Sequence, residues 1–412
     1  MDTKMSILAT KTTVATGALV CYIALCRGLR YLRRDRRHAS SPYKTREDFK
    51  RMTAEDAYQI TYYIQALEFP WMTGKALNFA LFRTYGIPSI SKLLCETQQL
   101  GKVEYAGRRY VDTSVLIVEF LSNSPTSERA NSAIARMNYL HSRYQKAGKI
   151  SNDDLLYTLS LFVLEVERWI RMYEWRTLTP LELCGLGTHW KVIGEAMGID
   201  YSCLRHGPSD FKDGLEFFED LKEWSDNYEH RCMVPNKFNH QLAEETTRIL
   251  LTDIPGPLKP FGKTVVTSLM DERLRSAMIY DKPSPMYLKA VKFMFGVRNV
   301  FLKFLIPPRP YALRYALLSE QPNPKTGRYH VKEYDNEPWY FKSTFFSRNS
   351  PTAWFRWAIG EPHPGDGKQY RPEGYHIFEV GPKKLEGHGQ EECKETRDRL
   401  MASNRGRCPF AV

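Results

Sequence analysis

The feature that most constrains the fold is a run of apolar residues spaced as on one side of an α-helix. Between residues 152 and 175, one set of apolar residues consists of Leu155, Leu156, Leu159, Phe162, Val163, Val166, Trp169, Ile170 and Tyr173. They recur every three or four residues, which is the spacing of one broad helix face. The sequence therefore predicts a long helix here that buries its apolar side.

Helix signals recur along most of the chain, and no repeat of fixed period interrupts them. Thr179-Pro180-Leu181-Glu182 combines an N-cap residue, Pro at the first helical position and Glu at the third, which predicts a helix that starts at Pro180. The other expected helices cover residues 54–67, 74–85, 88–94, 111–121, 127–147, 211–229, 236–252, 261–279 and 286–305. Pro70 is expected to end the first of these regions. The fold class that follows is all-α.

Composition and proline positions divide the chain into three expected parts. With 412 residues, of which 42% are hydrophobic, the chain can build a large core and is not disordered. Residues 1–37 are expected to form a membrane anchor with a basic flank, and residues 38–52 a polar linker. The catalytic domain is expected to span 38–317, since prolines in 306–310 close the helical part. Residues 318–412 predict an irregular extension packed on that domain.

The N-terminal segment predicts an uncleaved membrane anchor. Thr12–Cys26 carries no charge, and six arginines follow between Arg27 and Arg37. The run is shorter than the roughly 20 residues of a typical span, but flanking basic side chains can lengthen it by snorkelling. A signal peptide is the competing interpretation, although no small-residue cleavage site follows. The arginines favour anionic lipid over nucleic acid, and they place the rest of the chain in the cytosol.

The cysteines fit a reducing compartment, and the missing glycosylation sites fit a cytosolic catalytic part. Eight cysteines are scattered without a CxxC pair, which argues against a structural zinc site and against a disulfide scaffold. No Asn-x-Ser/Thr motif with a permitted middle residue occurs.

His141 is the most informative single residue. Ile134, Met137, Asn138, His141 and Tyr144 share one helical stripe. A buried imidazole needs a partner, which is either a backbone carbonyl or a metal such as haem iron. In the preceding helix, Arg109 and Thr113 are four residues apart and share a face, either as a capping or surface pair or as polar groups of a site.

Other chemistries have weaker support. A di-iron bundle needs Glu-x-x-His on two helices, and Glu165, Glu174 and Glu182 are too irregularly placed for one. The thiolate-like loop around Cys408 has no helix after it. The remaining histidines considered show no ligand spacing: His189, His206, His230 and His240.

Four long strings of the chain resemble the fungal ER-bound oxygenases of the mpaB type. These strings are Phe79–Ser91, Ser124–Ala130, Ile134–Tyr144 and Lys149–Phe162, and a weaker likeness covers most of 45–310. That family is distantly related to the bacterial rubber oxygenases, or latex clearing proteins, which are all-α, globin-like haem b enzymes that cleave isoprenoid C=C bonds with O₂.

The resemblance implies roles for particular residues. His141 would be the proximal haem ligand, and Arg109 and Thr113 would be the distal-side catalytic pair. Arg136 is expected to contact a haem propionate. The rubber oxygenases have a Lys at the position of Asp112, which can occupy the distal iron position, so the distal side is where this chain departs from them. The base proposed in those enzymes has no secure counterpart, with Glu96 as the nearest guess.

The expected function is a single-pass, ER-membrane-bound haem b oxygenase that faces the cytosol. It would use O₂ to cleave a C=C bond in the farnesyl-type side chain of a lipophilic secondary metabolite, with membrane lipid but no nucleic acid as a partner. Two alternatives stay open, a non-catalytic lipid-binding helical protein and a haem hydroxylase that leaves the chain uncleaved. The exact substrate, the electron donor and the oligomeric state are left open.

Overall fold

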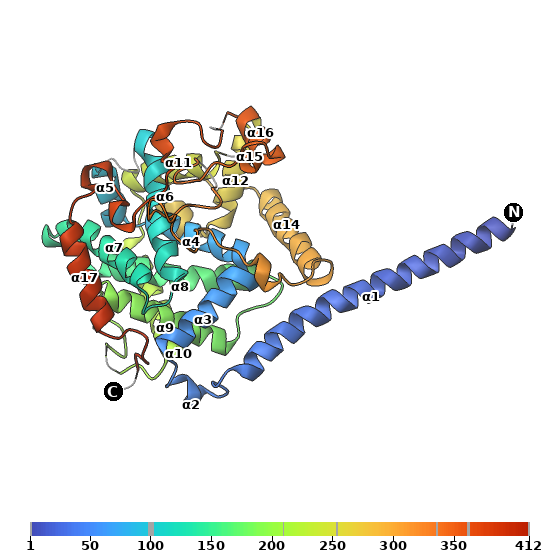
Figure 1. Ribbon diagram of the computed structural model, residues 1–412, viewed down its shortest axis with the longest axis horizontal. Helices are drawn as coiled ribbons and strands as arrows, with labels where there is room; N and C mark the ends of the chain where they lie inside the picture. The colour runs from blue at the N-terminus through green and yellow to red at the C-terminus, as the bar shows by residue number, and fades with distance from the viewer. Residues whose placement is uncertain are drawn as a thin grey trace.

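The structure, a computed structural model, describes residues 2–97, 103–208, 210–252, 254–334, 337–360 and 363–410 and is all-α there (Figure 1). Within those ranges β-structure is limited to isolated bridges such as Leu318–Val331. The α-helices are α1 (Asp2–Ser40), α2 (Arg46–Phe49), α3 (Ala54–Tyr63), α4 (Pro70–Thr84), α5 (Pro88–Glu96), α6 (Val103–Leu121), α7 (Glu128–Lys146), α8 (Asn152–Tyr173), α9 (Pro180–Ala196), α10 (Gly214–Cys232), α11 (Lys237–Leu250), α12 (Lys259–Leu269), α13 (Glu272–Ala277), α14 (Pro285–Phe304), α15 (Phe345–Arg348), α16 (Pro351–Ala358) and α17 (Gln390–Ala402). The all-α prediction is confirmed.

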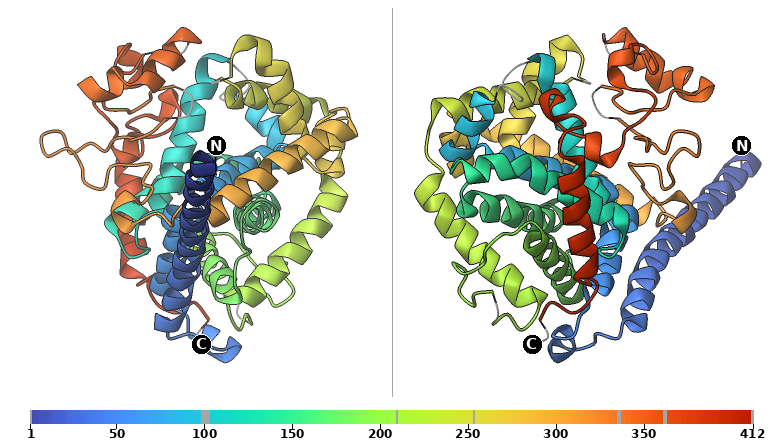
Figure 2. Two further views of the ribbon diagram at one scale, coloured as in Figure 1. Left: turned by 90° about the vertical axis from the view of Figure 1, so that its right-hand side faces the viewer. Right: turned by 60° about the vertical axis from the view of Figure 1, so that its left-hand side comes forward.

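The long helix expected from the apolar periodicity is α8, and it lies at the centre of the body. It packs against α4, α9 and α10, and Leu156, Val163 and Ile170 are fully buried. Figure 2 (left) views this green helix end-on, with other helices around it. A helix covered on several sides needs the wide apolar face that its sequence has.

Helix starts follow the capping signals of the sequence. Thr179 accepts a hydrogen bond from the backbone of Glu182, whose side chain accepts one from Thr179, and Pro180 occupies the first turn of α9. Ser127 caps α7 through a single hydrogen bond, which its side chain accepts from the backbone of Ala130, and Gly148 after the last turn has a left-handed φ of 66°.

Several boundaries differ from the expectation. Pro70 begins α4 rather than only ending the region before it, because Pro fits the first turn of a helix. Residues 38–52 are not a plain linker, since α1 runs to Ser40 and α2 follows. The stretch 261–279 divides into α12 and α13, where Asp271 caps the second helix. The extension contains α15, α16 and α17, so it is less irregular than predicted.

Helix α1 projects far from the body (Figure 1). Residues 11–40 form the one helix in the described part of the chain that is long and apolar enough to cross a membrane. Its C-terminal half packs on the body, where Cys26 and Arg30 are buried.

The extension covers the outer sides of α6 and α7. Helix α17 packs along α7. The hydroxyl of Tyr340 donates to Asp112 on α6, and that of Tyr375 donates to Glu119 two turns later. These contacts pack the extension on the helices that precede it, and the division of the chain into domains stays a prediction.

Candidate functional site

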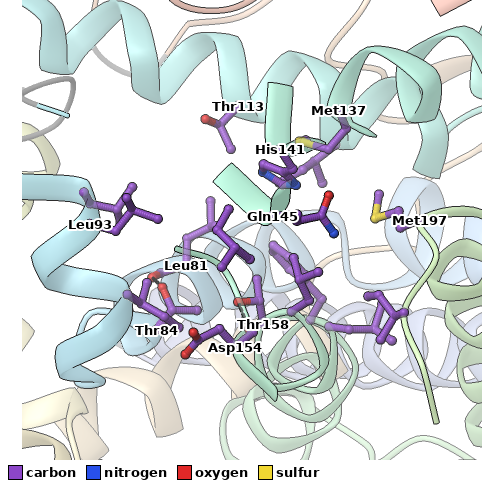
Figure 3. Close-up of a pocket in the computed structure, with 18 of the residues that line it drawn as sticks. Leu81, Thr84, Leu93, Thr113, Met137, His141, Gln145, Asp154, Thr158 and Met197 are labelled. Carbon is purple, nitrogen blue, oxygen red and sulfur yellow. Dashed lines mark hydrogen bonds between the residues drawn. The ribbon is translucent and has the colours of Figure 1, made fainter. Parts of the chain in front are cut away.

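A cavity of about 200 Å³ lies between helices α4 to α8 (Figure 3). Most of its wall is apolar, and the stacked rings of Phe162 and Trp190 close one side with centroids 5.1 Å apart. The polar residues on the wall include Thr84, Ser89, Arg109, Thr113, Asn138, His141, Gln145, Lys149, Asp154 and Thr158. A mainly apolar hollow with a few convergent polar groups is typical of a small-molecule or cofactor site.

His141 points into this cavity from α7 and has no hydrogen-bond partner in the described part of the chain. Protein surrounds the side chain, and the part of the ring that stays accessible lines the hollow. Neither ring nitrogen hydrogen-bonds to any group in the described part of the chain, so the carbonyl partner considered from the sequence is not found. Burial, helped by the positive charge of Arg109, lowers the pKa of His141 to about 4. The imidazole is thus neutral at physiological pH and keeps a free lone pair, as a metal ligand requires.

Arg109 reaches the same cavity from α6 as an unpaired cation. Its Nη1 is buried without a hydrogen-bond partner, and no carboxylate lies within ion-pair distance among the described residues. Burial is the largest effect on this group and lowers its pKa, although a guanidinium stays charged in a protein. An unpaired buried charge is costly, and a ligand that brings negative charge would offset that cost.

Thr113 lies one helical turn after Arg109, and both side chains line the cavity, as the i, i+4 spacing predicted. Figure 3 draws Thr113 and His141 among the residues that line the cavity. The Thr113 hydroxyl donates a 2.8 Å hydrogen bond to the backbone carbonyl of Arg109, which leaves its oxygen lone pairs as acceptors. The structure therefore brings together three of the four predicted site residues, Arg109, Thr113 and His141.

Arg136, the fourth predicted site residue, lies elsewhere. It is fully buried on the far side of α7 and does not line the cavity. Its Nε, Nη1 and Nη2 each donate a 2.8 Å hydrogen bond to a backbone carbonyl of the extension, those of Val380, His388 and Leu385. The expected contact with a propionate has no support in this placement, and the residue fastens the extension to α7.

Asp112 also faces away from the cavity. It is fully buried, accepts a 2.7 Å hydrogen bond from Tyr340 and lies 3.5 Å from the guanidinium of Arg108. Desolvation raises the pKa of this carboxyl to about 6, against the opposing effect of Arg108. The residue that departs from the rubber-oxygenase pattern is therefore not on the cavity wall, and it does not fill the space opposite His141.

Residues that the sequence did not single out complete the wall. Gln145 follows His141 by one turn, and Thr158 faces the cavity from α8. Helical spacing from His141 could have pointed to Gln145, but nothing local marks Thr158. Glu96 is half-exposed, pairs with Lys149 at 3.7 Å and does not line the cavity.

A second hollow of about 410 Å³ adjoins the first. Leu81, Tyr110 and Ile117 line both, so these three side chains form the partition between them. The second hollow is bounded by α4, which contributes Trp71, and by α6. Parts of the segment 309–339, which contributes Trp339, complete its wall. A ligand longer than the first cavity has room to continue here.

Among the described residues that line the cavity, His141 is the single imidazole donor. Across the ranges that the structure describes, no group of three or more His, Cys, Asp or Glu side chains could hold a metal ion. The di-iron alternative therefore gains no support from these residues, whereas a haem needs only one strong nitrogen ligand.

Comparison with known proteins places the chain in a family. It is 44% identical over 398 residues to the ER-bound oxygenase mpaB' of Penicillium brevicompactum, covering 96% of this chain and 94% of that protein. It is 40% identical over 362 residues to the ER-bound oxygenase mpaB of the same organism, covering 88% and 86%. The ER-bound oxygenase mpaB of Penicillium roqueforti (strain FM164) is 45% identical over 266 residues, 65% of this chain and 89% of that protein. No family model matches. The chain belongs to the family of ER-bound oxygenases of the mpaB type.

Proposed function

We propose that this oxygenase is haem-dependent and that His141 is the axial ligand of haem b. The observation that carries the proposal is a pair of groups in one cavity, a neutral imidazole and a guanidinium whose Nη1 is buried, neither of which has a hydrogen-bond partner or counter-ion among the described residues. The buried, unpartnered Nη1 of Arg109 is costly in a protein interior, and a haem would give both Arg109 and His141 a partner.

The residues that line the cavity fit a haem. The neutral His141 ring offers a nitrogen lone pair at physiological pH, and the apolar wall suits a macrocycle. Arg109 offers buried N–H donors and a positive charge, which suit a propionate or a polar oxygen near the iron. Haem, when bound, supplies the iron chemistry that activates O₂.

The chain's own residues would bind and orient the substrate. The apolar walls hold a prenyl chain extended and exclude water. Arg109 donates hydrogen bonds to negative charge that develops on oxygen, and the Thr113 hydroxyl orients a neighbouring polar group. The hollow behind Leu81, Tyr110 and Ile117 accommodates the rest of a substrate longer than the first cavity.

The proposed reaction is oxidative cleavage of one C=C bond in a farnesyl-type side chain of a lipophilic secondary metabolite. Both atoms of O₂ enter the products, so that one alkene and one O₂ give two carbonyl compounds and no further reductant is consumed in the balance. The buried, mainly apolar cavity, which suits an uncharged hydrocarbon chain, supports this choice.

The proposed location is the ER membrane, with the catalytic body on the cytosolic side. The relatives are named ER-bound, and α1 can cross a membrane. The six arginines after the apolar run favour the cytosolic side by the positive-inside rule.

Absorption spectroscopy of the purified full-length chain tests the proposal. We expect a Soret band that is lost or shifted in His141→Ala and kept in His230→Ala, a histidine on the surface of α10. Incubation with a farnesylated phenol under air should give two carbonyl fragments by mass spectrometry. A colourless protein that is folded and active would overturn the haem assignment, and a product heavier by one oxygen atom would favour a hydroxylase.

A further inference from the structure

Helix α14 exposes an apolar stripe that no described residue covers. Its outward residues are Met286, Ala290, Phe293, Val297, Val300 and Phe301. They recur every three or four positions, and the Phe293 side chain is 73% exposed. Leu258 and Phe261, before and within α12, are also exposed, and the Phe261 ring lies 6.0 Å from that of Tyr287 on α14. We call this surface the α14 face.

The α14 face is unusual because the helix is apolar on both sides. Its inward side is already occupied, since Phe295 stacks on Tyr173 with ring centroids 4.3 Å apart and Val291 is buried. A surface helix of a soluble protein normally turns charged residues outward. A contiguous exposed apolar patch of this kind marks a contact with another protein or with a membrane.

The end of α14 lies against the apolar part of α1, which favours the membrane. The Tyr22 hydroxyl donates a 2.8 Å hydrogen bond to the carbonyl of Leu305, and Arg30 donates one of 2.9 Å to that of Ile306. Tyr22 belongs to the uncharged run Thr12–Cys26, so the last part of that run already touches the body. Figure 2 (left) looks at the side from which α1 projects and shows α14, in orange, beside it.

The length of the apolar run adds a second argument. The fifteen residues of Thr12–Cys26 span about 22 Å at the helical rise, whereas the hydrocarbon core of a bilayer is about 30 Å thick. A run this short draws the body against the bilayer, because Tyr22 near its end already contacts Leu305. Contact at Tyr22 and Leu305 then brings the α14 face to the depth of the head groups and upper acyl chains.

The charges of this surface suit an anionic membrane. Helix α14 contains no acidic residue, and Lys289 and Lys292 are exposed on it. Lysines beside an apolar stripe are typical of helices that lie in the plane of a membrane interface. A face meant for another soluble protein would not need this arrangement next to a membrane anchor.

Aromatic residues of the extension form a second element on the same side of the molecule. Phe346 in α15 is 85% exposed, and Trp354, Phe355 and Trp357 in α16 are each more than half exposed. In Figure 2 (left), α1 points toward the viewer, and the red-orange helices α15 and α16 lie at the upper left of the same view. Trp residues are enriched at the membrane–water interface.

We propose that the α14 face is a second membrane-contact surface, which inserts into the head-group region beside the transmembrane helix and holds the catalytic body against the lipid. This membrane contact goes beyond the proposed activity, but it depends on α1 crossing the bilayer. Trp71 lies behind α14, with its ring 6.4 Å from that of Phe295, and lines the larger hollow. Insertion therefore places this hollow next to the acyl chains from which a lipophilic substrate would come.

Photo-crosslinking of the full-length chain in nanodiscs tests the proposal without haem or activity. The discs contain phosphatidylcholine and phosphatidylserine, and p-benzoylphenylalanine replaces Phe293, Phe346 or, as a control, Met401. Met401 is also exposed and apolar but belongs to α17, on another side of the body. We expect lipid adducts at 293 and 346 at least tenfold above those at 401. Replacing Leu19 on α1 reports separately whether the anchor is inserted.

Two results would overturn the inference. Lipid adducts at Leu19 without an excess at Phe293 over Met401 would show an inserted anchor whose α14 face stays clear of lipid. Adducts at Phe293 to a second protein chain would make the surface a self-association face. Lys289 and Lys292 would attract the anionic head group of phosphatidylserine. The double substitution Lys289→Glu with Lys292→Glu should therefore lower the lipid adducts at Phe293 and leave those at Leu19 unchanged.

Discussion

The hydroxyl of Tyr340 donates a 2.7 Å hydrogen bond to Oδ1 of Asp112, and this bond ties the extension to the helix that carries Arg109. Asp112 and Arg108 share one side of α6, whereas Arg109 and Thr113 share the cavity side. Helix α7 has the same division, with Arg136 bound to the extension and His141 in the cavity. The extension thus fixes the positions of both helices that carry the site.

Asp112→Asn should remove a pH dependence of stability. The pKa of Asp112 is raised to about 6 in the folded chain by desolvation, from an ordinary value of 3.8. Between pH 3.8 and about 6, Asp112 is deprotonated in the unfolded chain but still protonated in the folded chain. The free energy of unfolding therefore falls as the pH rises through this window, by at most about 3 kcal/mol. Urea unfolding of the detergent-solubilised full chain at pH 4 to 7 should show a smaller fall in Asp112→Asn.

Tyr340→Phe provides the opposite test of the same pair. It removes the hydrogen bond that lowers the pKa of Asp112, so the fall in stability should extend to higher pH than in the parent chain. Equal pH profiles for Tyr340→Phe and the parent would contradict the role given to this contact.

Arg109→Met and Arg108→Met should change stability in opposite directions. The Nη1 of Arg109 is buried and has no hydrogen-bond partner or counter-ion among the described residues, so replacing Arg109 in the haem-free chain should raise the free energy of unfolding by about 1 to 3 kcal/mol. Arg108 pairs with Asp112 and Glu386, so replacing it leaves a buried carboxylate and should lower that free energy.

Titration with haemin should also distinguish Arg109 from Arg108, by the affinity for haemin. Arg109→Met should weaken binding at least tenfold, about 1.4 kcal/mol, because the cavity loses its cation. Arg108→Met should bind haemin with the parent affinity as long as it is folded. A destabilised Arg109→Met with unchanged haemin affinity would show that Arg109 is only a packing residue.

Arg136→Gln should loosen the extension. The three carbonyls of Val380, Leu385 and His388 lose a charged donor, at a cost of about 3 kcal/mol. Limited proteolysis should then cut within 380–402 more rapidly than in the parent. Arg397→Gln, which breaks a surface pair with Glu128, should cost less than about 1 kcal/mol and serves as the control.

Local signals in the sequence predicted most helices, because capping and apolar spacing act over a few residues. The N-cap at Thr179 and the wide face of α8 are examples, and both depend on neighbours within one or two turns. The expectation that Pro70 only ends a helical region is wrong, because a proline that stops one helix can also start the next, as Pro70 does in α4.

The site was less predictable, since the orientation of a helix depends on distant partners. Periodicity placed Arg109 with Thr113 correctly, but it could not tell that Asp112, three residues from Arg109, faces Tyr340 from another part of the chain. The role of Arg136 likewise depends on carbonyls more than 240 residues away. The second hollow combines residues 62–122 with residues 309–339, and no local pattern marks such a pairing.

Leu81→Trp should obstruct passage between the two hollows. Leu81 lines both and is half-buried, so an indole has space to project into the partition without displacing a core side chain. A substrate whose chain occupies both hollows should lose kcat/KM by at least tenfold, whereas a substrate short enough for the first cavity should be affected much less. The Soret band should stay unchanged, because His141 is untouched. Leu77→Trp narrows only the second hollow and should therefore affect the long substrate less than Leu81→Trp does. Equal losses for long and short substrates in Leu81→Trp would mean that the larger hollow is not part of the substrate path.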